Sequence, residues 1–441
     1  MRWLILLLLS MLTLGDVLQV QMSLAPGLSV KNLLLYWIVF ALLARIVVSG
    51  ELRAQLPALQ AAFALLIGYA MASWVVAGLV IHYPRYDMIQ SGISLKGLLI
   101  DPALLLFATF YALRTSDDVR AVLKGFALAL TFANFITVTD VIGLTHFGLR
   151  VGDSGAEEGR VFGVFGHAND TAGLIVCLLP GIAALAVTSR HRILWWGMSL
   201  VSLAVLIMTV SRGAYVAAVL GSAWAMYACR RYLPVALMVR TALLGLLTVI
   251  VGVLLVSLLD PHMGGILRDR MLGQSTSVSA DDISSGRTVI WMAAIGMMMR
   301  TPVTLLTGFG WDTYSVMPFH FVTHNHYLSL WFELGIPGLA AFLFIFGYVL
   351  VVARRALSVP GAAEMRPHLI AFIFGMLCLS IVLMFGNMLA PWPYIWIYIG
   401  VMMRAAMLTL EPAPQALPRV RAPPLAPAAR RATQASGDLR T

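Results

Sequence analysis

The stretch FVTHNHYLSLWFELGIPGL, residues 321–339, passes from two histidines into an apolar run that continues well beyond it. The run extends from about residue 328 to residue 353, which is enough to cross a hydrocarbon core about 30 Å thick. Three polar residues precede it, His324, Asn325 and His326, and imidazole in hydrocarbon is costly unless it has a partner or a task. The stretch therefore predicts a membrane-spanning helix with polar side chains at its start.

The rest of the chain has the same apolar character. Its 441 residues are 60% hydrophobic and 11% charged, whereas a soluble domain carries about 25% charged residues, and its mean hydropathy is +0.88. The apolar runs are continuous, without the alternation of barrel strands. We therefore predict an all-α polytopic membrane protein whose first apolar run is a span and not a signal peptide. The twelve expected spans are 2–20, 32–50, 57–81, 96–113, 121–143, 170–188, 193–210, 213–229, 236–259, 328–353, 368–387 and 391–410.

The basic residues predict the orientation of these spans. If the N-terminus is cytoplasmic, about two-thirds of the 30 basic residues fall on the cytoplasmic side, as the positive-inside rule requires. Both termini are then cytoplasmic, and the net charge of +10 reflects topology and does not indicate binding to nucleic acid. Residues 1–410 form a single transmembrane domain, and the Pro/Ala/Arg-rich residues 411–441 form a disordered cytoplasmic tail.

This topology leaves two long external loops, at about residues 144–169 and 260–326. Long loops in compact proteins tend to carry function. Within the second loop, the polar residues Ser284 and Ser285 precede the apolar segment RTVIWMAAIGMMM. This pattern predicts a helix at the membrane surface, so that the loop is partly helical.

Three arginines stand out on this external side. Arg212 lies at the junction of two spans, Arg287 lies near the start of the expected loop helix, and Arg160 precedes a glycine-spaced turn. Each of them can be a plain interfacial arginine whose side chain extends to the headgroups. Alternatively, each can bind an anion, with help at Arg287 from the free N–H groups of a helix start. The residues alone leave both readings open.

The histidines also have more than one reading. His324 and His326 point to different sides of a helix, and no partner at metal-ligand spacing accompanies them, so we predict no metal site. A histidine at a helix start can be satisfied by the backbone alone. The sharper hypothesis is a general base, because neutral imidazole, with a reference pKa near 6.5, accepts a proton at neutral pH.

Four segments of the chain resemble the O-antigen ligase and polymerase superfamily in the order that the superfamily has them. HNHYLSLWFELGIPGL resembles its His-Asn-x-Tyr-Leu…Glu-Leu-Gly signature, and the others are GRVFGVFGHAN, SRGAY, and SGRTVIW followed by GFGWDTY. The resemblance covers roughly Arg160 to Leu339 in motifs, and the twelve-span layout agrees with it.

The resemblance implies a GT-C-type membrane glycosyltransferase with its site at the periplasmic face of a Gram-negative inner membrane. Such ligases transfer glycan from undecaprenyl diphosphate to the lipid A–core oligosaccharide, invert the anomeric centre and need no metal or other cofactor. By position, the essential histidine of the superfamily corresponds to His324 and its arginines to Arg212 and Arg287. Arg160 and Asn169 lie in the preceding loop motif. The resemblance implies that Arg212, Arg287 and Arg160 bind the diphosphate of the substrate, and that Asn169, Asn325 and His326 support the site.

Several functions share these motifs. An O-antigen polymerase and a protein O-oligosaccharyltransferase would bind the same lipid carrier and differ in the acceptor. A lipid or glycan transporter belongs to another class, but transporters place polar residues near the middle of the membrane, and here they cluster at one face. The sequence therefore favours a ligase, and it leaves the acceptor undecided.

Overall fold

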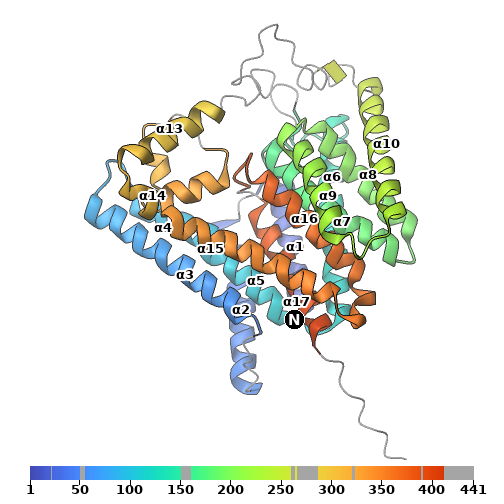
Figure 1. Cartoon of the computed structure of the whole chain (residues 1–441), viewed down its shortest axis with the longest axis horizontal. Coiled ribbons are helices and arrows are strands. Elements are labelled where there is room, and N and C mark those ends of the chain that lie inside the picture. The colour runs from blue at the N-terminus through green and yellow to red at the C-terminus, as the bar shows by residue number, and fades with distance from the viewer. Residues whose placement is uncertain are drawn as a thin grey trace, which may run out of the picture.

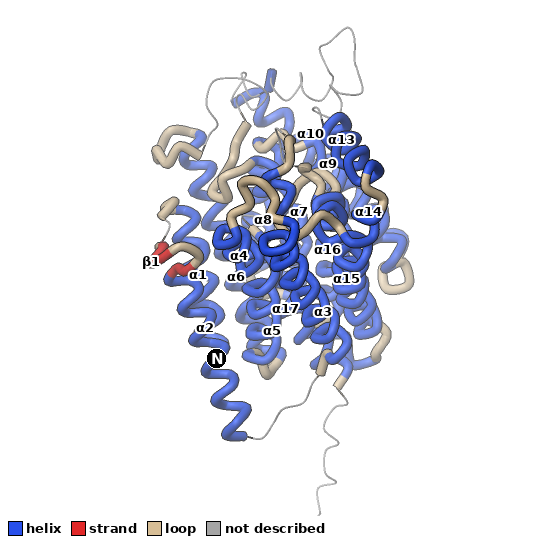
Figure 2. The backbone as a smooth tube through the Cα atoms, turned by 90° about the vertical axis from the view of Figure 1, so that its left-hand side faces the viewer, coloured by secondary structure: helices blue, strands red, loops and turns tan. Residues whose placement is uncertain are grey.

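The structure is a computed structural model that describes residues 1–20, 22–49, 55–149, 160–259, 264–265, 287–319, 323–388 and 391–411. Most of these residues are helical, and the helices pack side by side (Figure 1). Irregular segments gather at the upper end of Figure 2, away from the N-terminus. The expected tail, beyond its first residue, and most of residues 260–286 lie outside the described residues.

Each of the twelve expected spans overlaps a helix, and α4 lies outside all of them. The helices are α1 (Arg2–Val17), α2 (Val30–Ser49), α3 (Pro57–Val75), α4 (Met88–Leu95), α5 (Asp101–Ala112), α6 (Ser116–Val141), α7 (Ala168–Thr188), α8 (Arg192–Met208), α9 (Arg212–Cys229), α10 (Val235–Leu259), α15 (His326–Leu357), α16 (Arg366–Val382) and α17 (Trp392–Leu410). The predicted loop helix is present as α13 (Arg287–Arg300), and it is followed by α14 (Val303–Thr307) and by two 3-10 segments, Thr313–Val316 and Pro360–Glu364.

Among the described residues, eight helices are long and apolar enough to cross a membrane. The chain is thus an all-α polytopic membrane protein. The eight segments are Val30–Val48, Pro57–Ile81, Met88–Ala112, Ser116–Val141, Ala168–Thr188, Val235–Leu254, His326–Leu357 and Trp392–Leu410. Helices α8 and α16 are apolar but shorter, and the predicted number of twelve spans stays a prediction.

Small residues let the central helices pack closely. Helix α16 packs against α7 and α9, and α17 packs against α5. A Cβ added to Gly375 would lie 2.1 Å from the carbonyl oxygen of Cys177, and one added to Gly221 would lie 2.6 Å from Cys378. Such contacts suit helix packing in membranes, where small residues at the interface let backbones approach each other. Cys177 and Cys378 are free and buried, in agreement with a packing role.

Two local features lie outside the sequence prediction. The first is a short hairpin of strands β1 (Ser23–Ala25) and β2 (Leu28–Ser29) between α1 and α2. The second is a pair of π-helical segments: η1 (Val76–Ile81) continues α3, and η2 (Lys96–Ile100) joins α4 to α5. The span expected at 96–113 therefore starts earlier, at Met88, and Lys96 lies within it and not at its end.

Helix α15 is interrupted at Gly335, whose φ of 62° lies in the left-handed region. The interruption leaves two backbone carbonyls of α15 without partners in the helix, and the segment after α14 hydrogen-bonds both. Phe309 N–H donates to the oxygen of Phe332 (2.8 Å), and Gly310 N–H donates to the oxygen of Glu333 (3.0 Å). A Cβ on Gly335 would lie 2.1 Å from the Leu306 oxygen, so the backbones are in direct contact. The ELG and GFGWD motifs thus form one structural unit.

Replacing Gly335 with alanine is expected to destabilise this unit. The left-handed conformation alone costs a residue with a Cβ about 1–2 kcal/mol, and the contact with the Leu306 oxygen forces a backbone shift in addition. Gly347→Ala is the matched control in the same helix, because a Cβ there meets no atom within 4 Å. Thermal unfolding in detergent should show a lower Tm for Gly335→Ala and an equal or higher Tm for Gly347→Ala. Equal Tm values for the two variants would contradict the close contact.

Candidate functional site

Two of the motif segments and the first half of α7 meet at the turn that follows α16, residues 383–388, called here the 383–388 turn. His326 N–H, at the start of α15, donates to the oxygen of Leu383 (2.8 Å). At the start of α9, Gly213 packs so closely on Phe385 that an added Cβ would lie 2.8 Å from it. In α7, Gly173 approaches Met388 in the same way. The turn therefore joins the starts of three helices that are distant in sequence.

A polar cluster ties the start of α7 to the start of α9. Asn169 accepts two hydrogen bonds on its side-chain oxygen, from Arg160 Nη2 (2.9 Å) and from Ser211 Oγ (2.8 Å). Arg160 is buried and also donates from Nε to the oxygen of Thr209 (3.1 Å). Ser211 directly precedes Arg212, which is the first residue of α9. Two of the predicted site residues, Arg160 and Asn169, thus belong to one cluster, and a third, Arg212, directly follows a member of it.

Helix α13 places Arg287 beside the segment that contains His324. Trp291 Nε1 donates to the oxygen of Thr323 (2.8 Å), the residue before His324. Arg287 is the first residue of α13 and lies one turn before Trp291, and residues four apart share a helix face. The side of α13 that carries Arg287 is therefore the side that contacts the His324 segment.

His324 has an unusual backbone conformation. Its φ is 49°, in the left-handed region where histidine is uncommon, and its side chain is partly exposed. A left-handed backbone conformation of a non-glycine residue is less favourable than an ordinary one by about 1–3 kcal/mol. It persists where the surrounding structure imposes it, which is often at functional sites. The observation singles out His324 within its motif.

The two neighbours of His324 have structural roles. Asn325 is the N-cap of α15, and its side chain accepts a hydrogen bond from Leu328 N–H (3.0 Å). The ring of His326 packs between those of Phe342 and Trp392, at centroid distances of 4.9 and 5.1 Å. These contacts fix the start of α15 and hence the position of His324.

The segment after α14 is anchored at both ends. On one side, the backbone N–H groups of Asp312 and Tyr314 hydrogen-bond the Glu333 carboxylate. On the other side, Trp311 Nε1 donates to the oxygen of Ser91 in α4 (3.1 Å). Burial raises the pKa of Asp312 above its usual range, although a hydrogen bond with Ser91 opposes the shift. This segment thus connects α15 with α4.

Several of these positioning residues were not predicted. Glu333 belongs to a quoted motif, but its spacing did not reveal that it binds backbone N–H groups. Ser211 and Trp291 act through contacts with segments far away in sequence, which no local pattern records. Among the described residues, no group of three or more His, Cys, Asp or Glu side chains is arranged to hold a metal ion.

The fold defines a multi-pass helical membrane protein, and the contacts described above bring several of the motif segments close together. Residues 197–343 match the family model described as O-antigen ligase, a segment that covers about a third of the chain. No curated protein matches the chain. The match at residues 197–343 supports the O-antigen ligase family that the motifs predicted. Members of this family are glycosyltransferase-like ligases and polymerases.

The cap at Asn325 can be separated from a role in chemistry. Asn325→Ala removes the acceptor for Leu328 N–H and should lower the free energy of unfolding by about 1 kcal/mol. Asn325→Ser keeps a capping oxygen and should keep both stability and transfer activity. Chemical denaturation in detergent, combined with an activity assay, checks both variants. A stable but inactive Asn325→Ser protein would show that the amide does more than cap α15.

Proposed function

We propose that this protein is an O-antigen ligase, which transfers a glycan from undecaprenyl diphosphate to the lipid A–core oligosaccharide. The observation that carries the proposal is that the matched O-antigen ligase segment contains Arg212, Arg287 and His324, on helix starts that the described contacts tie together. We place this site at the periplasmic face of the inner membrane, with both termini cytoplasmic, in accordance with the distribution of basic residues.

Arg212 and Arg287 are assigned to the diphosphate of the donor. Each is the first residue of its helix, where free backbone N–H groups favour an anion. A guanidinium is always charged and can bind two phosphate oxygens at once. Charge grows on the diphosphate as it leaves, and donors fixed in advance stabilise that charge in the transition state.

Arg160 was expected to bind the same diphosphate. Its burial and its bonds to Asn169 and to the Thr209 carbonyl favour a different part in the site. We assign it to positioning: through Asn169 and Ser211 it fixes the start of α9, on which Arg212 lies. Asn169 is then the link between the two arginines.

His324 is assigned the role of general base. It removes the proton from the acceptor hydroxyl while the hydroxyl oxygen bonds to the anomeric carbon, and the carbon–oxygen bond to the diphosphate breaks with its electron pair. The attack comes from the side opposite to the leaving group, so that the configuration inverts. The diphosphate leaves as a stabilised anion, and the step requires no general acid.

The assignment of His324 is tested best with asparagine, because asparagine also tolerates left-handed backbone. His324→Asn should insert and fold normally and lose about 10²–10⁴-fold in transfer rate, the usual contribution of a base. The measurement is transfer of lipid-linked glycan in proteoliposomes that offer lipid A–core, glycan on carrier lipid, and protein as competing acceptors. Wild-type product on either of the latter two acceptors would replace the ligase assignment with a polymerase or with a protein glycosyltransferase.

The assignment of Arg287 predicts a difference between two arginines of the same helix. Arg287→Lys keeps the charge but loses bidentate geometry, and the rate should fall about 10- to 100-fold, as expected for one lost hydrogen bond between charged groups. Arg300→Lys, at the far end of α13, is the control and should leave the rate unchanged. If both variants transferred glycan at the wild-type rate, Arg287 would be a plain interfacial arginine.

A further inference from the structure

Three arginines lie at the opposite end of the helices from the candidate site. They are Arg230, directly after α9, Arg354 in the last turn of α15, and Arg366, the first residue of α16. They are called here the basic cluster. Because α9 begins with Arg212, the whole length of that helix separates the basic cluster from the candidate site.

The packing of α9 against α16 brings Arg230 and Arg366 to the same level. At the start of α9, Gly213 packs on Phe385, which follows the end of α16. Further along α9, Gly221 packs on Cys378, which lies earlier in α16. The two helices therefore run antiparallel. With a rise of about 1.5 Å per residue, the end of α9 lies beside the start of α16.

Arg354 joins this place from α15, and it shares one tyrosine with Arg230. The guanidinium of Arg230 lies over the ring of Tyr227, 4.0 Å from its centroid. The charge of Arg354 also acts on the hydroxyl of Tyr227 and on the thiol of Cys229, both in the last turn of α9. Stacking occupies the face of a guanidinium and leaves N–H groups at its edge for an anion.

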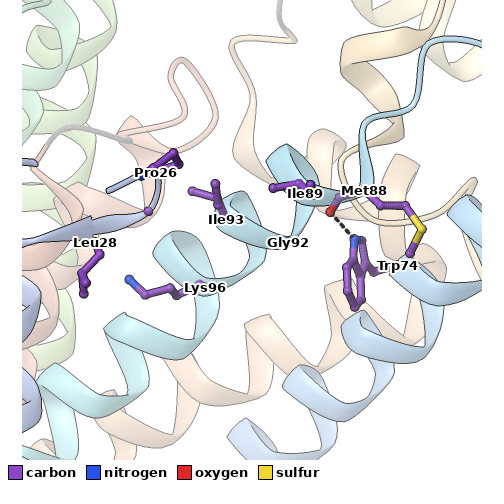
Figure 3. Close-up of a pocket in the computed structure, with 9 residues that line it drawn as sticks. Pro26, Leu28, Trp74, Met88, Ile89, Gly92, Ile93 and Lys96 are labelled. Carbon is purple, nitrogen blue, oxygen red and sulfur yellow. Dashed lines mark hydrogen bonds between the residues drawn. The ribbon is translucent and has the colours of Figure 1, made fainter. Parts of the chain in front are cut away.

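Acids do not balance the charge of the basic cluster. Among the described residues, none of its three arginines forms an ion pair with a carboxylate. Glu364, two residues before Arg366, is paired with Arg120 instead. By contrast Lys96, the one charged residue that lines the groove drawn in Figure 3, is paired with Asp101 at 2.7 Å. Cations that converge without an acid favour an anion between them.

Arg366 is the member of the basic cluster that the helix dipole does not explain. A cation in the last turn of a helix is favoured by the dipole, which accounts for Arg354, whereas a cation in the first turn is disfavoured. The first turn of α16 contains no acid that would offset this effect, and Nε of Arg366 is buried without a hydrogen-bond partner. Since buried donors are as a rule paired, an acceptor from outside the chain is expected here.

An exposed apolar face of α9 leads to the basic cluster. Val216, Leu220, Trp224 and Tyr227 follow one another at helical spacing, and they are between 42% and 64% exposed. In a chain that spans a membrane, such a face contacts acyl chains, and a tyrosine at its end suits the level of the headgroups. An apolar face that ends in cations complements an anionic phospholipid.

We propose that the basic cluster binds the phosphate group of an anionic phospholipid, whose acyl chains lie along the exposed face of α9. The proposal does not rest on the proposed function. A zwitterionic phospholipid carries a cation beside its phosphate, so it would leave the charge of the three arginines unbalanced. The basic cluster should therefore select phosphatidylglycerol over phosphatidylcholine.

The first test measures bound lipid. Full-length protein in phosphatidylcholine nanodiscs is titrated with phosphatidylglycerol, and bound lipid is counted by native mass spectrometry. Arg230→Gln combined with Arg354→Gln should weaken binding about tenfold. Arg114→Gln combined with Lys124→Gln is the matched control, because it removes two exposed cations near the start of α6, at the same end of the helices. This control should bind as the wild type does. Equal weakening by the two double variants would show diffuse attraction to a basic surface and would overturn the proposal.

The second test measures thermal unfolding of Arg366→Gln. In phosphatidylcholine its Tm should equal or exceed that of the wild type, because the variant loses a cation that opposes the helix dipole. Phosphatidylglycerol should raise the Tm of the wild type more than that of the variant. Equal shifts in the two proteins would remove Arg366 from the site. Inorganic phosphate lacks acyl chains and should not displace the bound lipid; its displacement by phosphate would replace the lipid assignment with a site for a free anion.

Discussion

The direct contact between the backbones at Gly308 and Gly335 is the constraint on which the site depends. Only residues without a Cβ permit this contact, and it replaces a turn of α15 by hydrogen bonds to another segment. The segment after α14 is thereby fixed to α15, and Glu333 adds its carboxylate to the same junction. Helix α13, which carries Arg287, is joined to this segment through the short helix α14, so the contact helps to fix the position of α13 relative to His324.

The arginines of the site are held in two different ways. The guanidinium of Arg160 donates hydrogen bonds to acceptors within the protein, and the residue is almost completely buried. Both observations are expected of an arginine that stabilises the structure. Arg212 and Arg287 begin helices and are partly exposed, so a ligand can reach them. This difference separates residues that shape the site from residues available to an anion, although all three have the same charge. Charge alone would not have distinguished them.

The sequence predicted the helices well, because a long apolar run in a chain of this composition has one physical solution. The loop helix at Arg287 was also predicted, from polar residues that precede an apolar segment. The hairpin and the π-helical segments were not predicted, since they depend on contacts with other helices, and Lys96 was therefore placed at the end of a span. In the candidate site, the motifs identified His324 and the arginines. The cap at Asn325 has a local signal, an asparagine before an apolar run, whereas the bonds of Glu333 have none.

The π-helical segment between α4 and α5 has a consequence for how the chain can vary. An additional residue in a helix rotates everything that follows by about 100° around the axis. The face that α5 presents to α17 therefore depends on the number of residues in η2 more than on their identity. Substitutions within Lys96–Ile100 act locally, whereas the deletion of one residue there would turn Asp101 and the whole of α5 away from their partners. In a chimeric protein joined across this segment, keeping the number of residues in η2 should therefore matter more for folding than keeping their identity.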